Sequence, residues 1–143
     1  MDLPADDESD MISDGKKQKD SVLVAVGENH LGKQLAAMID RMGYDVVVAS
    51  NGEEALVLFL KRSFDLVFTA LKMQGKDGLT LSLQVKATSL NIPVVLILDN
   101  YLENIMNRIK AGRIDCVMSK PLRSGKIQKA VQYFVTKRSR LHC

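Results

Sequence analysis

The chain has 143 residues, of which 46% are hydrophobic and 26% are charged, and its formal net charge is +3 at pH 7. This length and composition indicate a single soluble globular domain and exclude a chain that is disordered throughout. No apolar run approaches the roughly 20 residues that cross a bilayer, and the opening residues, MDLPADDESD, lack the basic and apolar regions of a secretory signal.

Charges are distributed unevenly along the chain. Residues 1 to 20 carry seven acids and three lysines, with too few apolar side chains to offset the entropy of ordering them. From residue 104 onward there are ten Lys or Arg residues and one acid, Asp115. We therefore expect a flexible acidic N-terminal tail over residues 1 to 20, a folded domain over residues 21 to 136 and a basic C-terminal tail over residues 137 to 143.

The first predicted strand and helix follow directly after the acidic segment. The run VLVAV, at residues 22–26, is continuous, apolar and short enough for a strand that is buried on both faces. Apolar side chains then recur at helical spacing from Leu31 to Met42, and Gly43 provides a C-terminal stop. The pattern therefore predicts a buried strand followed by an amphipathic helix.

The same alternation continues to the end of the domain. A second strand is predicted at residues 44–49, and Ser50 and Glu53 have capping-box spacing ahead of a second helix. The third apolar run is FDLVFTAL, at residues 64–71. The remaining predicted elements, in chain order, are a helix through Leu79, Leu83 and Val85, a strand at residues 93–98, a helix through Leu102, Ile105, Met106 and Ile109, a strand at residues 115–118 and a helix through Ile127, Val131 and Phe134.

Five short strands that alternate with five helices predict an α/β fold with a parallel sheet covered on both faces. Right-handed crossovers leave few topologies, and the flavodoxin-like three-layer (βα)5 sandwich with strand order 2-1-3-4-5 is favoured at this length. Ligands in such sheets bind at the carboxyl ends of the strands. These ends are expected near Gly27, Ala70 and Leu98.

Residues 21 to 136 resemble the receiver domain of two-component response regulators, the CheY-like family. The resemblance rests on five segments in the family's order and spacing: VLVAVGEN, RMGYDVVVASNGEEAL, FDLVFTALKMQGKDGL, IPVVLIL and DCVMSKPL. It implies a magnesium-dependent transfer of a phosphoryl group from a phosphohistidine to an aspartate. That chemistry needs an oxygen nucleophile, hard anionic ligands for Mg²⁺ and a cation near the phosphoryl oxygens.

The positions that carry this chemistry in the family are mostly replaced in this chain. The lysine of the Lys-Pro pair remains as Lys120, and Pro121 is implied to follow a cis peptide bond. The replaced positions are the phosphoacceptor at Ala70, the acidic pair at Val26 and Gly27, the hydroxyl position at Leu98 and the aromatic switch position at Val117.

Other side chains near these positions offer weaker substitutes. Moving the acceptor to Thr69 would turn its hydroxyl to the other side of the strand. Glu28 lies one position beyond the usual acidic pair, and a lone carboxylate is poor support for Mg²⁺. Lys120 has two interpretations: it extends into water or is held by Asp99 or Glu28, or else it still binds an anion.

We therefore predict a degenerate pseudo-receiver that lacks the phosphoacceptor aspartate, is not an enzyme and requires no metal or cofactor. It would act as a protein-interaction module in phosphorelay signalling, with a histidine kinase, a phosphotransfer protein, another receiver or a second copy as partner. One alternative is phosphorylation at an unconventional residue, with Thr69, Asp77 and Asp99 as candidates. The cysteines, Cys116 and Cys143, form no disulfide framework, which favours a cytoplasmic or nuclear location.

The basic C-terminal third is the predicted interaction face. By resemblance it covers the fourth helix, the fifth strand and the last helix, and a basic face steers acidic partners toward it. Three alternatives remain: a solvated helix face, a cover formed by the acidic N-terminal tail, and a nucleic-acid-binding surface. The residues are Arg108, Lys110, Arg113, Arg123, Lys126 and Lys129.

Overall fold

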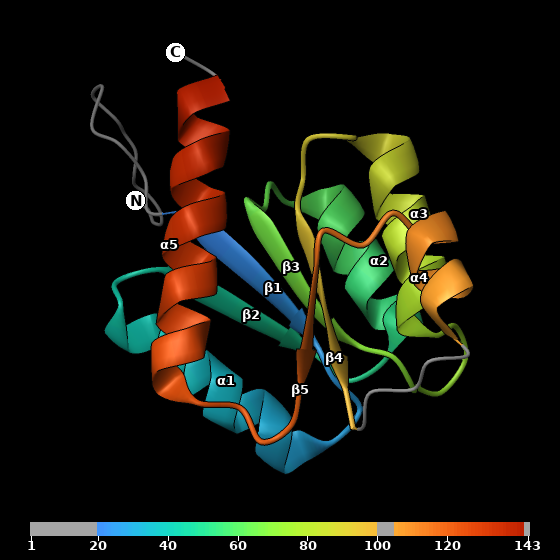
Figure 1. Cartoon of the computed structure of the whole chain (residues 1–143), viewed down its shortest axis with the longest axis horizontal. Helices are drawn as coiled ribbons and strands as arrows, with labels where there is room; N and C mark the ends of the chain where they lie inside the picture. The colour runs from blue at the N-terminus through green and yellow to red at the C-terminus, as the bar shows by residue number, and fades with distance from the viewer. Residues whose placement is uncertain (1–19, 100–104, 142–143) are drawn as a thin grey trace, which may run out of the picture.

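The computed structural model of the chain describes residues 20–99 and 105–141. All but the last residue of the predicted N-terminal tail, Leu102 and the last two residues of the chain lie outside this described part. Figure 1 shows a central sheet of parallel strands in the order β2-β1-β3-β4-β5. The predicted fold class and strand order are therefore confirmed. The strands are β1 (Ser21–Ala25), β2 (Asp45–Ala49), β3 (Leu66–Ala70), β4 (Val94–Leu98) and β5 (Cys116–Ser119).

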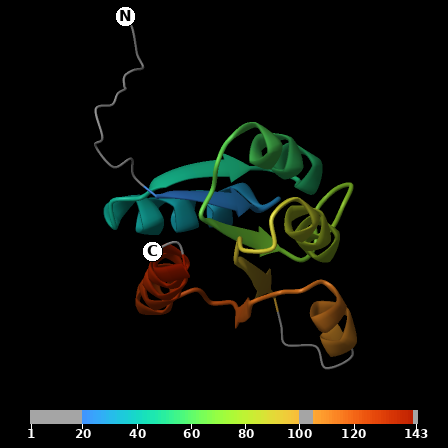
Figure 2. The same ribbon diagram turned by 90° about the horizontal axis from the view of Figure 1, so that it is seen from above.

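Helices cover both faces of the sheet and complete the three layers. Figure 2 shows α1 and α5 on one face and α2, α3 and α4 on the other. Each strand is followed by one helix, and every crossover returns to a parallel strand, which is the adjacent strand except where β2 crosses over β1 to β3. The helices are α1 (Asn29–Arg41), α2 (Gly52–Lys61), α3 (Gly78–Thr88), α4 (Met106–Ala111) and α5 (Ser124–Leu141). Each of these described helices is too short or too polar to traverse a lipid bilayer.

The central strands are buried on both faces, which explains their continuous apolar sequences. In β1, Val22 and Val24 pack into the core under α1 and α5, whereas Leu23 and Ala25 pack into the core under α2 and α3. Successive side chains of a strand point to opposite faces, so a strand with helices on both sides needs apolar residues at every position. A smaller core, around Leu96, lies under α4.

The start of α2 differs from the predicted capping box by one residue. Asn51, not Ser50, is the N-cap, and its side chain accepts a 2.7 Å hydrogen bond from the backbone N–H of Glu54. The carboxylate of Glu54 reaches back to the Ser50 backbone N–H at 2.7 Å. The predicted Ser50–Glu53 pairing is therefore wrong, because asparagine caps a helix as well as serine does and stands one residue later.

Several other boundaries differ from the sequence prediction. The helix α5 continues to Leu141, beyond Phe134, the last residue from which this helix was predicted. Residues 126 to 141 contain neither Gly nor Pro, and nothing in them stops a helix. The fifth strand begins and ends one residue later than predicted. The helix predicted through Leu79, Leu83 and Val85 is α3; Leu79 and Val85 are buried, but Leu83 is exposed and Leu81 is buried.

Candidate functional site

The carboxyl ends of β1, β3 and β4 meet at a crevice of about 220 Å³. Its apolar lining includes Val26, Ala70 and Leu98, the positions that the resemblance aligned with an acid, the acceptor and a hydroxyl. Val26 and Leu98 are each 2% exposed and belong to the hydrophobic core. The strand ends thus bring together the predicted site residues, and at these three positions they present hydrocarbon groups.

The hydroxyl of Thr69 does not line this crevice. Thr69 is fully buried, and its Oγ1 donates a 2.9 Å hydrogen bond to the carbonyl oxygen of Ala70. Gly78 closes the loop after β3, where its N–H donates a 2.8 Å bond to the carbonyl of Leu71. An added Cβ at Gly78 would lie 2.2 Å from the Ala70 carbonyl oxygen, so only glycine fits this approach.

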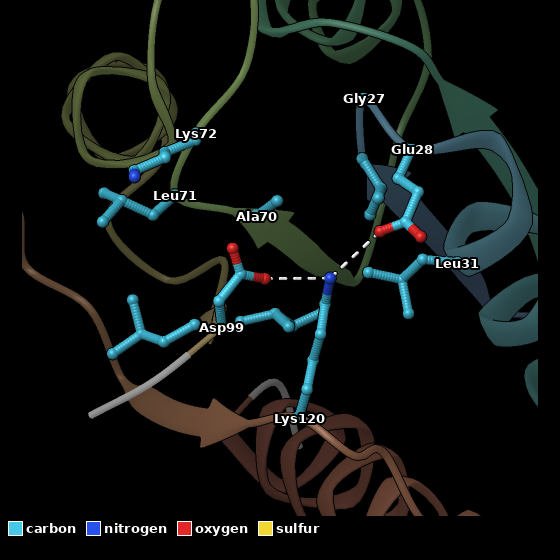
Figure 3. A pocket seen from close by; sticks show the side chains of 11 residues that line it. Gly27, Glu28, Leu31, Ala70, Leu71, Lys72, Asp99 and Lys120 are labelled. Atoms are coloured by element: carbon cyan, nitrogen blue, oxygen red, sulfur yellow. Dashed lines mark hydrogen bonds and ion pairs between the residues drawn. The ribbon is translucent and has the colours of Figure 1, made fainter.

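Lys120 is held between two carboxylates. Figure 3 shows its side chain extending across the crevice toward Glu28 on one side and Asp99 on the other. Its Nζ lies 3.0 Å from Glu28 Oε1 and 2.9 Å from Asp99 Oδ1. The hydrogen bond to Asp99, followed in size by the hydrogen bond to Glu28, raises the pKa of Lys120. The hydrogen bond from Lys120 lowers the pKa of Asp99. The peptide bond from Lys120 to Pro121 is cis, the isomer that the resemblance implies.

The charges that line the crevice are balanced. Two lysines, Lys72 and Lys120, face two acids, Glu28 and Asp99. Among the described residues no group of three or more His, Cys, Asp or Glu side chains is placed to hold a metal ion. Mg²⁺ prefers several oxygen ligands in octahedral geometry, whereas both carboxylates here already bind an ammonium group. The donor set of this crevice does not fit Mg²⁺.

Asp77 lies outside the crevice and has a structural role. It is the N-cap of α3, where its Oδ1 accepts a 2.9 Å hydrogen bond from the backbone N–H of Thr80. Its Oδ2 lies 2.9 Å from Arg108 on α4. Burial raises the pKa of Asp77, but the Thr80 N–H and the Arg108 guanidinium outweigh burial and hold it below its ordinary value.

Two further polar contacts tie α3 to the segment between α4 and β5. The hydroxyl of Ser82 donates a 2.6 Å hydrogen bond to the carbonyl of Gly112. Lys86 Nζ lies 2.6 Å from Asp115 Oδ2, which also accepts a 2.8 Å bond from the backbone N–H of Val94. These contacts were not predicted from the sequence. Ser82 and Lys86 are four positions apart and so lie on one face of α3, but Thr80, Gln84 and Thr88 are polar as well, so no distinct signal marks the pair.

The predicted basic face divides into two groups. Lys110 and Arg113 are exposed at the end of α4 and just after it, and Arg108 pairs with Asp77. Arg123, Lys126 and Lys129 are exposed around the start of α5. Figure 2 shows that α4 and α5 flank β5, so the strand separates the two groups. The switch position, Val117, is half-buried on β5 and packs against the core under α4.

The sequence model of the family described as "Response regulator receiver domain" matches residues 22–132. The chain belongs to this family. The match runs from the second residue of β1 to the middle of α5, so it includes the crevice and both basic groups.

Segments similar to this chain occur within longer proteins. The probable transcriptional regulator ycf27 of Cyanidium caldarium is 29% identical over 119 residues, which are 81% of this chain and 46% of that protein. The sensor histidine kinase RcsC of Salmonella typhimurium is 27% identical over 104 residues, which are 72% of this chain and 11% of the kinase. This chain therefore spans less than half the length of either relative.

The solved structures agree on the fold. A CheY-like response regulator receiver domain protein from Methanospirillum hungatei superposes with a TM-score of 0.81 at 12% sequence identity, covering 86% of this chain and 98% of that one. At this low identity the likeness concerns the arrangement of strands and helices alone.

Proposed function

We propose that this chain is a receiver domain that works without phosphotransfer, as a protein-interaction module in two-component signalling. The observation that carries the proposal is the crevice itself. Its strand ends offer Val26, Ala70 and Leu98, and its two carboxylates are both bound to Lys120. Phosphoryl transfer here would lack an acceptor at the end of β3 and a metal to neutralise the phosphoryl oxygens.

The two ion pairs of Lys120 support this proposal for a second reason. Lys120 follows β5, Glu28 follows β1 and Asp99 follows β4, so one ammonium group joins three loops of the crevice. An anion entering the crevice would have to displace a carboxylate from Lys120. The balanced charge therefore argues against the alternative in which Lys120 binds a free anion.

The contacts of α3 support a single conformation of the surface around α4 and β5. Asp77, Ser82 and Lys86 each hold a group on α4 or in the segment that follows it. A ligand shifts the equilibrium between two conformations only if it binds them with different affinities. A crevice that accepts no phosphoryl group has no such ligand to shift the conformation of this surface. We infer that the surface is permanently in its binding state.

The basic groups on either side of β5 are the proposed docking surface. Arg123, Lys126 and Lys129 are exposed and would attract an acidic surface of a histidine kinase or of another receiver. To test this, Arg123, Lys126 and Lys129 are changed together to Glu, and proteins captured by this variant are compared with those captured by the unchanged chain. Lys33→Glu, at an exposed position on α1, shows the effect of a charge reversal away from this surface. Retention of every captured protein by the triple variant would refute this surface.

Phosphotransfer is tested directly by intact mass. The full chain is incubated with Mg²⁺ and a small acyl phosphate, and we expect no added phosphoryl group. A variant with Ala70→Asp, Val26→Asp and Gly27→Asp serves as the comparison, since it supplies the nucleophile and the metal ligands together, whereas Ala70→Asp alone supplies only the nucleophile. A phosphoryl group on Thr69, Asp77 or Asp99 of the unchanged chain would overturn the proposal.

A further inference from the structure

The outer surface of α2 and α3 is unusually apolar. Val57 and Leu60 on α2 are 51% and 61% exposed, and Leu83 on α3 and Leu90 just after it are 45% and 64% exposed. These are four of the seven large hydrophobic side chains exposed among the described residues, so the apolar surface is concentrated here. Figures 1 and 2 show α2 and α3 side by side on one face of the sheet. Concentrated exposed apolar surface of this kind marks an interaction site.

Opposite charges lie on either side of Val57 along α2. Glu53 precedes Val57 by four residues and Lys61 follows it by four, a spacing that places all three on one face of a helix. Both charged residues are exposed, and in the described part of the chain neither forms an ion pair. The carboxyl group of Glu53 lies beside Gly75, so a change of rotamer would bring it outward.

We propose that a second copy of this chain docks on this face, with the two α2 helices antiparallel and a two-fold axis at Val57. Glu53 and Lys61 lie at equal distances on either side of Val57 and carry opposite charges. In an antiparallel pair, Glu53 of each copy therefore faces Lys61 of the other. A two-fold interface requires this kind of self-complementary surface, and the apolar side chains fill its centre.

The charge pattern favours a second copy over other occupants. A partner of one charge sign would attract one end of α2 and repel the other, whereas an antiparallel copy satisfies both ends. Antiparallel helices also bring opposite ends of their dipoles together. Glu54 does not disturb the pattern, because its carboxylate already accepts hydrogen bonds from the backbone N–H and the hydroxyl of Ser50.

This face is separate from the surfaces of the proposed function. It includes no residue of the crevice, and α4, β5 and α5 take no part in it. Self-association through α2 would leave the basic groups beside β5 free for another protein. The proposed dimer does not depend on phosphotransfer, because its residues do not line the crevice.

Sedimentation equilibrium of the full chain tests the apolar centre of the interface. We expect a monomer–dimer equilibrium that Val57→Glu weakens at least about tenfold, because the variant buries two like charges at the two-fold axis. Met106→Glu is the matched control, an equally charged change at an exposed apolar residue on α4. A chain that stays monomeric at every concentration, or a dimer broken by Met106→Glu and not by Val57→Glu, overturns the proposal.

Charge exchange tests the orientation. Glu53→Lys and Lys61→Glu each place like charges opposite one another in both halves of the dimer, and each should weaken association about three- to tenfold. Mixing the two variants restores opposite charges at both ends, so a heterodimer of normal strength is expected. The double variant Glu53→Lys with Lys61→Glu should also dimerise normally. If neither the mixture nor the double variant recovers, the antiparallel arrangement is wrong.

Discussion

Two lysine–carboxylate clusters lie at opposite ends of the paired strands β4 and β5. At the amino end, Lys86 from α3 meets Asp115, and the same carboxylate accepts the N–H of Val94. At the carboxyl end, Lys120 meets Asp99 and Glu28. The first lysine side chain is 8% exposed and the second is 33% exposed. The chemistry is the same, and the access to water differs.

This difference assigns separate roles to the two clusters. Inside a protein an ammonium group that loses its partner cannot be solvated, so the pair is expensive to break. Near water the same loss is largely compensated by solvent and ions. We infer that the Lys86 cluster stabilises the fold, whereas the Lys120 cluster holds the loops of the crevice together and contributes little to the free energy of unfolding.

The largest effect is expected from Asp115→Ala. It leaves the ammonium of Lys86 buried without a partner and removes an acceptor from the N–H of Val94. We expect the free energy of unfolding to fall by about 3 kcal/mol, measured by urea denaturation.

The double variant Lys86→Met with Asp115→Ala is the matched control for this prediction. An apolar side chain of similar length removes the unpaired charge, so most of the lost stability should return. If Asp115→Ala alone costs less than about 0.5 kcal/mol, as an exposed pair would, the assignment of separate roles to the two clusters fails.

The sequence predicts the fold and the location of the site for a simple physical reason. Strands buried on both faces must be apolar throughout, and parallel strands must end at one edge, which places Val26, Ala70 and Leu98 together. The partners of charged side chains are not encoded locally. Lys86 and Asp115 are 29 residues apart in the chain, and no periodicity links them.

Local signals also compete with one another in ways that only packing decides. Ser50 and Asn51 are both good helix caps, and the structure uses Asn51. Leu81 and Leu83 are equally hydrophobic, and the position of α3 against the sheet buries only Leu81. The sequence predicts that either Asp99 or Glu28 could hold Lys120. The structure shows that both carboxylates contact it, which the sequence alone does not reveal.

Asp77→Ala should have an intermediate effect, because it removes a helix cap but leaves no buried charge without a partner. The change removes the N-cap of α3 and should cost about 1 kcal/mol. Arg108→Ala removes only the exposed partner and should cost less than about 0.5 kcal/mol. Urea denaturation of both variants separates the two contributions. Equal losses would mean that the ion pair, and not the cap, stabilises this contact.

Lys120→Met should change stability least among the lysine variants, by about 0.5 kcal/mol or less. Its effect should instead appear in the crevice, because Glu28 and Asp99 lose the cation between them. We expect faster amide hydrogen exchange in residues 27–32 and at the end of β4, with β2 unchanged. Lys33→Met, at an exposed position on α1, is the control. Unchanged exchange in the crevice would show that Lys120 does not join its loops.

The smallest effect concerns acid pH and distinguishes Asp77 from Asp99. Both carboxyl groups have a lower pKa in the folded chain than the ordinary value of 3.8. A depressed pKa stabilises the fold above 3.8, and this contribution is lost as pH falls through the folded value. Asp77→Asn should therefore lower stability at pH 7 and make no difference in strong acid. Asp99→Asn should follow the same course with a much smaller amplitude, because water screens its exposed pair with Lys120. Urea denaturation at a series of pH values from 7 downward measures the free energy of unfolding of both variants. A change for Asp99→Asn as large as that for Asp77→Asn would show that the ion pairs of the crevice stabilise the fold.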